Sequence, residues 1–215
     1  MKVTMIGEPS SEACELAARM CYGAKDGMKA LLNAIDSGHD SLLEHEKFTF
    51  HVEDVSRVLL AQLTRHRIAS YSVRSQRYCG ATLDYVIPRT IYEDDELMAD
   101  LYRALNASEE FYTKAVNKGV PAEDARYFTY QAGITELVVT MNIRELRHFL
   151  SLRCCRRAQW EIRELADEML RQAKEVLPEF FANAGPGCVR GTCPEGKKSC
   201  GEPRKELLAR YTRDD

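Results

Sequence analysis

Apolar positions along the first 65 residues repeat with the periods of helices and strands. The spacing predicts a strand over 3–6, a helix from 11 or 12 to 22 that ends at Gly23, a helix over 26–37 that ends at Gly38, and a half-buried strand over 47–52. Either Asp54 or Ser56 should then cap a helix that runs toward Arg65, because both side chains can accept a backbone hydrogen bond.

The pattern changes at residues 68–78, which lack helical periodicity and are rich in serine and arginine. We predict loop and strand there, at the surface of a cleft. Further helices are expected over 94–118, from Pro121, over 143–154 and over 159–176, the last ending before Pro178. Residues 134–141 are apolar and β-branched but include Glu136, so a strand and a buried helix are both open.

The order of these elements indicates the α/β (α+β) class, and the 215 residues are enough for one substantial core. From Gly185 onward the periodicity ends, and glycine, proline, cysteine and lysine become frequent. We therefore expect a single catalytic domain over 1–184 and a Cys/Gly/Lys-rich C-terminal tail over 185–215.

Composition narrows the class of protein. Hydrophobic residues are 45% and charged residues 29% of the chain, an ordinary globular mixture. No apolar run approaches the roughly 18 residues of a membrane span, and the first residues lack the apolar region of a secretory signal. The eight cysteines then indicate a reduced, cytoplasmic protein rather than a disulfide framework. A net charge of −3 argues against a general nucleic-acid binder.

Positive charge is nevertheless concentrated locally. No acidic residue lies between Asp54 and Asp84. That stretch holds a first group of arginines: Arg57, Arg65, Arg67, Arg74 and Arg77. A later part of the chain holds a second group: Arg144, Arg147, Arg153, Arg156 and Arg157. Serines 70, 72 and 75 lie among the first group, and guanidinium groups mixed with hydroxyl donors suit a phosphate. Arginines without nearby carboxylates need another anion or a water-filled cleft. The alternative is a solvated basic face at a helix end.

The motif Arg65-His66-Arg67, followed after seven residues by Ser75, resembles the signature of the flavin-dependent thymidylate synthases. Other segments are similar to the same family in order and spacing across residues 38–165. They are Gly38-His39 with Glu44-His45 before the strand, Ala125-Arg126-Tyr127, Asn142-Ile143-Arg144 with His148, and Arg153 with Ala158-Gln159-Trp160.

The resemblance implies a ThyX-like fold, a mixed sheet flanked by helices, assembled as a homotetramer with flavin held between subunits. It implies a methyltransferase of nucleotide biosynthesis that converts dUMP to dTMP. Methylenetetrahydrofolate would donate the carbon, and FAD reduced by NADPH would supply the hydride. The implied partners are these small molecules, with no nucleic acid and no membrane. The chain has no Gly-x-Gly-x-x-Gly loop, so a Rossmann flavin site is not expected.

The resemblance also implies roles for individual residues. It assigns FAD binding to His39, Ser41, Arg65, His66, Arg67, Asn142, Arg144 and His148. It assigns dUMP binding to Gln62, Arg65, Arg74, Ser75, Gln76, Arg77, Arg126 and Arg153, with Arg153 catalytic at the uracil edge. No metal and no cysteine nucleophile are implied; Cys79 is the candidate if the chain instead used a thiolate.

Three features depart from the family pattern or lie outside it. Ser72-Val73 stands where members often have Asn-Glu, so contacts there are left to the backbone. Phe128 follows the Ala-Arg-Tyr segment where Leu-Pro is common. In the tail, Cys188, Cys193 and Cys200 could bind zinc with a fourth ligand. Their spacing is not that of a zinc knuckle, so we prefer the interpretation of a flexible or redox-sensitive tail. An arginine-rich nucleic-acid-binding module and a structural zinc protein built on the tail are the alternative functions.

Overall fold

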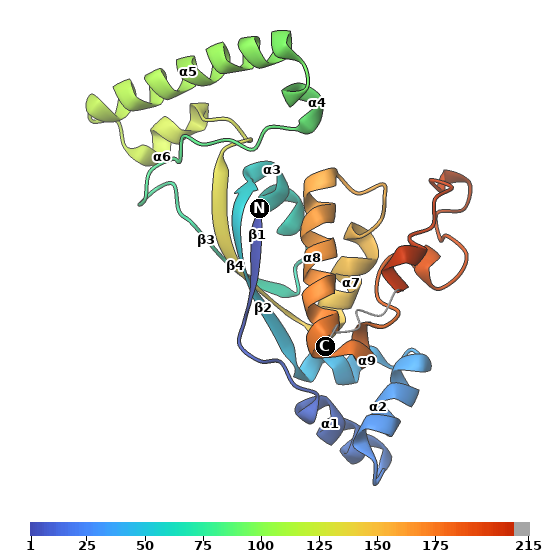
Figure 1. Ribbon diagram of the computed structural model, residues 1–215. Helices are drawn as coiled ribbons and strands as arrows, with labels where there is room; N and C mark the ends of the chain where they lie inside the picture. Colours follow the sequence, from blue (N-terminus) through green and yellow to red (C-terminus); the bar gives the residue numbers. More distant parts are fainter. Residues whose placement is uncertain (209–215) are drawn as a thin grey trace, which may run out of the picture. The chain divides into compact units, whose positions relative to one another are not determined.

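The computed structural model describes residues 1–208, which form a four-stranded antiparallel sheet and a set of helices. The strands are β1 (Lys2–Ile6), β2 (Lys47–Ser56), β3 (Ala69–Val73) and β4 (Ile134–Asn142), in the order β1-β2-β4-β3 (Figure 1). The chain divides into two compact units. Unit 1 contains Met1–Lys2, Val52–Thr64 and Ser72–Leu137; unit 2 contains Val3–His51, Arg65–Tyr71 and the chain from Val138 onward.

The α+β class is confirmed, but the expected mixed sheet is wrong, because the sheet is antiparallel. In unit 2 the hydroxyls of Thr49 and Thr140 lie 2.9 Å apart between β2 and β4. In unit 1, just beyond the end of β2 and before the start of β4, the Arg57 amide donates to the Gly133 carbonyl at 3.2 Å. The two segments run in opposite directions.

The structure resolves the ambiguity at 134–141 in favour of a strand. Alternate side chains of β4 are buried, beginning with Thr135 and ending with Met141, which is the period of two that a strand requires. Glu136 is tolerated because it falls on the other face, where it is only half-buried. Its carboxylate accepts a hydrogen bond from Arg74 at 3.1 Å, within unit 1.

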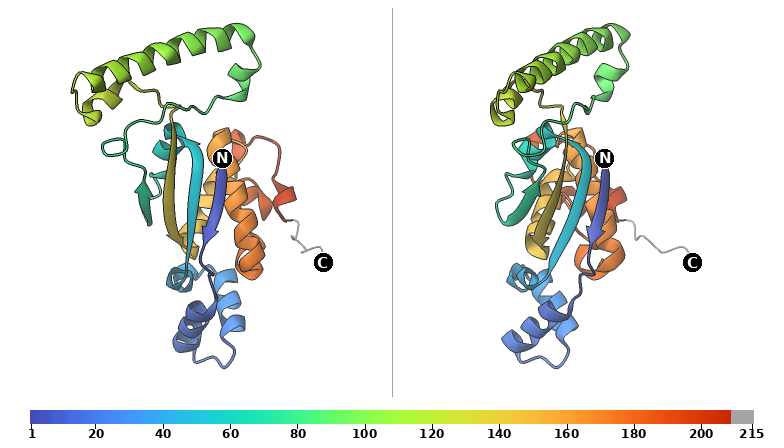
Figure 2. Two further views of the ribbon diagram at one scale, coloured as in Figure 1. Left: turned by 60° about the vertical axis from the view of Figure 1, so that its left-hand side comes forward. Right: turned by 90° about the vertical axis from the view of Figure 1, so that its left-hand side faces the viewer.

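Unit 2 packs helices against its part of the sheet. Helices α7 (Ile143–Arg153) and α8 (Trp160–Val176) contact each other, and α9 (Pro178–Phe181) follows (Figure 2). The ring of Phe48 on β2 meets Phe181 edge-on at 5.3 Å, and both side chains are fully buried. Gln172 on α8 accepts from the Met5 amide at 3.0 Å and donates to the Val3 carbonyl at 2.8 Å, which satisfies backbone groups of the edge strand β1.

The remaining elements of unit 2 precede β2. Helix α1 (Glu12–Tyr22) ends at Gly23, which adopts the left-handed conformation, and α2 (Gly27–Asp36) begins at Asp26, whose carboxylate accepts from the Lys29 amide. A 3-10 helix over Asp40–His45 then leads into the strand.

Unit 1 holds four further helices. They are α3 (Arg57–Leu63), α4 (Arg89–Tyr92), α5 (Asp95–Asn117) and α6 (Ala122–Ala125), with a 3-10 turn over Arg126–Phe128. Of the two candidate caps for α3, Ser56 is the one used: its hydroxyl accepts from the Leu59 amide at 3.0 Å. Asp54 instead has a positive φ of 57° within β2.

The chain beyond residue 185 is not loose where it is described. Three 3-10 turns over Gly187–Val189, Gly196–Lys198 and Lys205–Leu208 belong to unit 2, and Arg204 is buried. The division into a catalytic domain over 1–184 and a tail over 185–215 stays a prediction. Among the described residues, no helix has the length and apolar character needed to cross a membrane.

Replacing Ser56 tests the cap of α3. Ser56 is 2% exposed, so Ser56→Ala leaves a helix-start amide without its partner and should lower the free energy of unfolding by about 1 kcal/mol. Ser11 holds the same position before α1 but accepts no capping hydrogen bond, so Ser11→Ala is the control and should change stability by less than about 0.5 kcal/mol. Urea denaturation measures both; equal effects would contradict the assignment.

Candidate functional site

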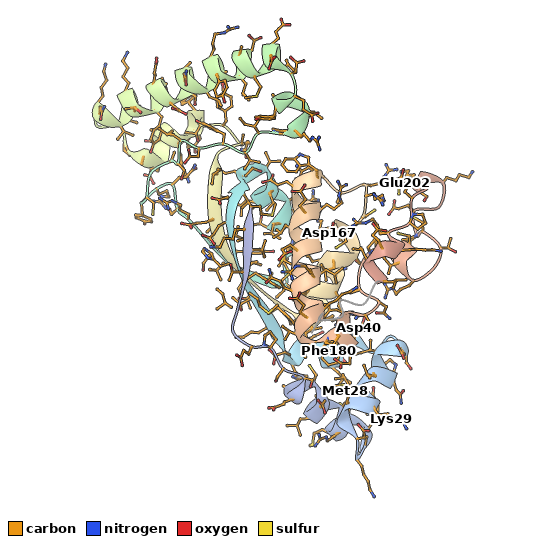
Figure 3. The ribbon with its side chains drawn as sticks, viewed as in Figure 1. Met28, Lys29, Asp40, Asp167, Phe180 and Glu202 are labelled. Atoms are coloured by element: carbon orange, nitrogen blue, oxygen red, sulfur yellow. The ribbon has the colours of Figure 1, made fainter. Side chains whose placement is uncertain are left out.

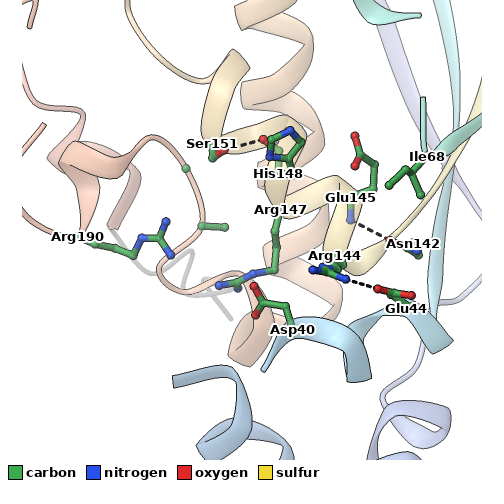
Figure 4. A pocket seen from close by; sticks show the side chains of 12 residues that line it. Asp40, Glu44, Ile68, Asn142, Arg144, Glu145, Arg147, His148, Ser151 and Arg190 are labelled. Atoms are coloured by element: carbon green, nitrogen blue, oxygen red, sulfur yellow. Dashed lines mark hydrogen bonds and ion pairs between the residues drawn. The ribbon is translucent and has the colours of Figure 1, made fainter. Parts of the chain in front are cut away.

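A cavity of about 580 Å³ lies in unit 2 and brings together residues from four separate segments. Three of the predicted flavin ligands line it: Asn142, Arg144 and His148 (Figure 4). The other lining residues are Asp40, Glu44, Ile68, Glu145, Arg147, Ser151, Ala184, Gly185 and Arg190. The size is within the range of small-molecule and cofactor pockets.

The junction between β4 and α7 places the three predicted ligands. Asn142 is the last residue of the strand and also the N-cap of the helix, where its side-chain oxygen accepts from the Glu145 amide at 2.8 Å. Arg144 and His148 are four residues apart on α7, so they share one face of the helix. No loop separates strand and helix, and the orientation of this face follows directly from the strand.

The lining combines arginines with carboxylates. Arg144 is paired with Glu44 from the 3-10 helix, and both side chains are about half exposed. Arg147 donates to the Phe180 carbonyl and, at 3.3 Å, to the Asn183 side chain. Burial lowers the pKa of Arg147, and the neighbouring Asp40 offsets part of that effect while Arg190 adds to it. Three guanidinium groups (Arg144, Arg147 and Arg190) and three carboxylates (Asp40, Glu44 and Glu145) line the cavity, so donors that suit a diphosphate lie among acids that balance their charge.

Directly beside this cavity, His66 forms a buried three-residue chain. Its Nδ1 lies 3.0 Å from Oε1 of Glu145, and its Nε2 accepts a hydrogen bond from Nε of Arg153 at 3.2 Å. The ring of Phe149 packs edge-on against it at 5.0 Å. His66 and Glu145 are 5% and 7% exposed, so the contacts are shielded from water.

These contacts define the protonation of His66. An arginine Nε–H can only donate, so Nε2 of His66 must carry a lone pair, and the single ring proton is on Nδ1, where it is donated to Glu145. Burial lowers the pKa of His66, and the charge of Arg153 adds to that effect, whereas the hydrogen bond to Glu145 opposes it. The neutral imidazole therefore orients Arg153 and links it to a buried carboxylate.

His66, Glu145 and His148 also place a nitrogen or carboxylate oxygen within 4.8 Å of one another, a spacing that a metal ion would accept. Both ring nitrogens of His66 are already used, one by Glu145 and the other by Arg153. A metal ligand needs a free lone pair on the nitrogen, so this hydrogen-bond chain is incompatible with metal binding through His66.

The other predicted flavin ligands are placed elsewhere in unit 2. His39 does not line the cavity; it borders a shallower hollow of about 320 Å³, and its Nδ1 lies 3.1 Å from the Tyr22 hydroxyl. Ser41, Arg65 and Arg67 are exposed. Burial is the first cause that lowers the pKa of Arg153, and the positive charge of the nearby Arg65 is the second. Helix α3, which the sequence predicted to run toward Arg65, ends at Leu63.

Most of the predicted dUMP ligands belong to unit 1, where carboxylates pair with the arginines. Arg74 bonds Glu136 at 3.1 Å, and Arg77 bonds the Glu123 carboxylate at 2.8 Å. Arg126 donates to the Glu123 carbonyl at 3.2 Å. The sequence suggested arginines without carboxylates, and this is corrected: the fold supplies acids from distant positions. The pairs are about half exposed, so each contributes roughly 0–1 kcal/mol and can be exchanged for a stronger anion.

The segment that carries Ser75 is a tight turn. The Cys79 amide donates to the Ser75 carbonyl at 2.9 Å, and the Arg77 amide donates to the Ser75 hydroxyl at 3.2 Å. Gln76 is buried, while Arg77 is exposed and stacks near the Tyr78 ring at 5.7 Å. Gln62 donates weakly to the Val58 carbonyl at 3.4 Å and has a further interaction.

Sequence reasoning missed Glu145, Arg147, Asp40 and Arg190. The signal for Glu145 was present, because an acidic residue three places after Asn142 matches a capped helix start. Arg147 was noticed only as part of an arginine group. Asp40 and Arg190 carry no local signal, since the fold alone brings them to the cavity.

The chain is similar in sequence to the known members of one protein family. Residues 4–179 match the family model described as "Thymidylate synthase complementing protein". The flavin-dependent thymidylate synthase of Geobacter sulfurreducens is 46% identical over 219 residues, covering 94% of each chain. That of Clostridium tetani is 42% identical over 215 residues and covers 86% of each. That of Thermococcus kodakarensis is 48% identical over 201 residues, covering 86% of this chain and 82% of its own.

A solved structure is similar in fold. It is a UMP/dUMP methylase from Streptomyces cacaoi, crystallised with 5-Br dUMP. The TM-score is 0.74 at 24% sequence identity, and the match covers 84% of this chain and 92% of that one. At this identity the likeness establishes the fold alone.

The protonation of His66 can be observed directly. In ¹⁵N-histidine NMR spectra at pH 7.5, His66 should be the Nδ1–H tautomer and should titrate below its ordinary pKa of 6.5. Because the pKa of His66 is lowered in the folded state, the contribution of His66 to the free energy of unfolding is complete above pH 6.5. This contribution is lost as the pH falls toward the folded-state pKa, by at most about 1.4 kcal/mol per pH unit. His66→Asn, which keeps a donor toward Glu145, identifies the resonance. An Nε2–H tautomer or a raised pKa would refute the chain of contacts.

Proposed function

Since the chain belongs to the flavin-dependent thymidylate synthase family, we propose that it converts dUMP to dTMP by reductive methylation. Methylenetetrahydrofolate is the proposed carbon donor and NADPH the proposed reductant. FAD, when bound, supplies the hydride, so the chain's own side chains have to bind, orient and stabilise charge rather than carry electrons. The observation that supports this best is the arginine-lined cavity of unit 2, with Arg153 linked through His66 to Glu145 of its lining.

The residues of that cavity fit the flavin dinucleotide. Arg144, Arg147 and Arg190 can neutralise a diphosphate, and the polar side chains of Asn142 and His148 can bond to ring or ribose groups. We retain the eight predicted flavin ligands as a proposal with two changes. Arg147 and Arg190 are added, and His66 is assigned to orienting Arg153 because both of its ring nitrogens are engaged within the protein. His39, Ser41, Arg65 and Arg67 remain proposed ligands that lie outside this cavity.

The nucleotide phosphate is proposed to bind the turn at Ser75 and the arginines of unit 1. Arg74, Arg77 and Arg126 offer guanidinium groups, and Gln62 and Gln76 offer amides for the remaining dUMP contacts. A phosphate dianion is a stronger partner for arginine than a single exposed carboxylate, so it can displace Glu123 and Glu136. Val73 stands where members often have an acid, and it brings no additional negative charge to this surface.

Arg153 is proposed as the catalytic residue. Burial lowers its pKa, but the group remains charged because a guanidinium does not lose its proton in water near neutral pH. The hydrogen bond from its Nε to His66 fixes the plane of the guanidinium while other donors remain available. A fixed positive charge beside the uracil would stabilise negative charge that develops on the ring during methylation.

A homotetramer is proposed as the working assembly. Support comes from helix α5, which exposes Leu97, Tyr102, Phe111 and Val116, an unusual set of apolar side chains for a surface helix. A cytoplasmic location, expected from the cysteines, stays a prediction. The arginine-rich nucleic-acid-binding alternative finds no support among the relatives, which are flavin-dependent thymidylate synthases.

Purified protein tests the function. We expect a yellow protein with a flavin spectrum, NADPH oxidation that responds to dUMP, and formation of dTMP. Arg153→Ala should lower turnover by about 10²–10³-fold while the fold and some flavin are retained. Arg89→Ala, at an exposed ion pair of helix α4, is the matched control and should keep full activity. Protein that takes up no added FAD, or an Arg153→Ala variant of normal activity, would refute the proposal.

The absence of a thiolate nucleophile is tested separately at Cys79. This cysteine is exposed and follows the turn at Ser75. Cys79→Ala should therefore keep turnover within about twofold, because a group that forms no covalent bond to the substrate contributes little to the barrier. Loss of turnover with flavin still bound would indicate a covalent mechanism instead.

A further inference from the structure

Four cysteines from two distant parts of the chain line one cavity in unit 2. Cys155 follows the end of α7, and Cys188, Cys193 and Cys200 come from the described part of the C-terminal segment. The cavity has a volume of about 580 Å³ and adjoins the one that holds Asn142 and His148, since Ser151 and Arg190 line both; Arg153 also lines it. All four are free thiols, and none is required by the proposed function.

The sequence alone showed only three of these residues, at a spacing that matches no zinc knuckle. The fold supplies the missing fourth ligand, because Cys155 lies 33 positions before Cys188 yet borders the same cavity. Sets of four cysteines that meet in this way are the usual ligands of a zinc ion or an iron–sulfur cluster.

The surroundings compensate the charge that such a site would carry. Four thiolates around a divalent ion or a cluster leave about two negative charges. The arginines that line the cavity are Arg153, Arg156, Arg157, Arg190 and Arg204, against the carboxylates of Glu195 and Glu202. Arg190 also lines the proposed flavin cavity, and Arg156 pairs with Glu202 at 3.5 Å and with Glu206 at 3.3 Å. Arg204 is buried, donates to the Cys154 carbonyl at 2.7 Å and pairs with Asp167 at 3.0 Å; Asp167 and Glu202 are labelled in Figure 3.

The segment over 186–204 also needs a source of stability. It contains only short 3-10 turns, and its buried side chains include Cys188, Val189 and Arg204. The Arg204 amide donates to the Cys188 sulfur at 3.5 Å, so one thiol already accepts a hydrogen bond as a metal-bound thiolate would. Loop-rich segments with so little apolar burial are commonly held by a disulfide or a metal.

We propose that Cys155, Cys188, Cys193 and Cys200 form a four-thiolate site for a thiophilic metal centre, which fastens the C-terminal segment to the end of α7. The spacing favours an iron–sulfur cluster. Within the described chain, no three of these sulfurs all lie within 4.8 Å of one another, whereas a zinc ion would hold them about 3.8 Å apart. A cluster separates its thiolates further, because several iron atoms lie between them.

Metal analysis of the full chain, purified without oxygen and chelators, tests the site. About one zinc per chain, or iron with an equal amount of acid-labile sulfide, supports the proposal and identifies the metal. Each of Cys155→Ser, Cys188→Ser, Cys193→Ser and Cys200→Ser should reduce the bound metal at least tenfold. Cys21→Ser and Cys79→Ser, at exposed cysteines away from the cavity, should retain it. Less than about 0.1 metal per chain, also after reconstitution with zinc or with iron and sulfide, would overturn the site.

Alkylation of the wild-type protein provides a readout that does not depend on the variants folding. Cys200 and Cys21 are both exposed, so without a metal their thiols should react with iodoacetamide at similar rates. A bound metal should slow Cys200 at least tenfold relative to Cys21, and removal of the metal should abolish the difference. Equal rates in the protein as isolated, or a disulfide between two of the four cysteines, would refute the proposal.

Discussion

The direct passage from strand β4 into helix α7 is the constraint on which the site depends. The Ile143 amide donates to the Glu46 carbonyl at 3.0 Å as the last step of pairing with β2, and Asn142 caps the helix at the same point. With no intervening loop, the angular position of every side chain on α7 is determined by the sheet. Glu145 bonds to the buried His66 and also lines the cavity, together with Arg144 and His148. The same junction determines the orientation of Arg153 at the end of the helix.

Local chemistry made much of the fold predictable. The capped starts of α2 and α5 at Asp26 and Asp94, and the glycine end of α1, depend on neighbours within four residues and were readable from the sequence. The strand at 134–142 was not, because an apolar β-branched run fits a strand or a buried helix until its partners are known. The direction of its pairing with β2 was likewise a property of the whole sheet, and the expected mixed sheet was wrong for that reason.

The site was predictable only in part, because local chemistry can be read from the sequence and contacts across the fold cannot. The Arg65-His66-Arg67 motif and Asn142 with His148 carried a family signal that the comparisons confirm at the level of the family. What the sequence could not supply were partners across the fold: Glu145 for His66, Glu123 for Arg77, and Cys155 for the cysteines of the C-terminal segment. A residue's neighbours in sequence say little about partners that lie 33 to 79 positions away. Such contacts decide whether an arginine is a ligand or a structural cation.

The pairing of Arg74 with Glu136 and of Arg77 with Glu123 has a consequence for selectivity. Both cations are neutralised within the protein, so at the proposed dUMP site binding would be an ion exchange rather than a simple attraction. A ligand gains only the difference between its own interaction and that of the carboxylate it replaces. A phosphate dianion has that advantage, whereas an uncharged nucleoside has nothing to exchange and leaves both pairs intact. The internal acids thus act as competitors that favour nucleotides over nucleosides.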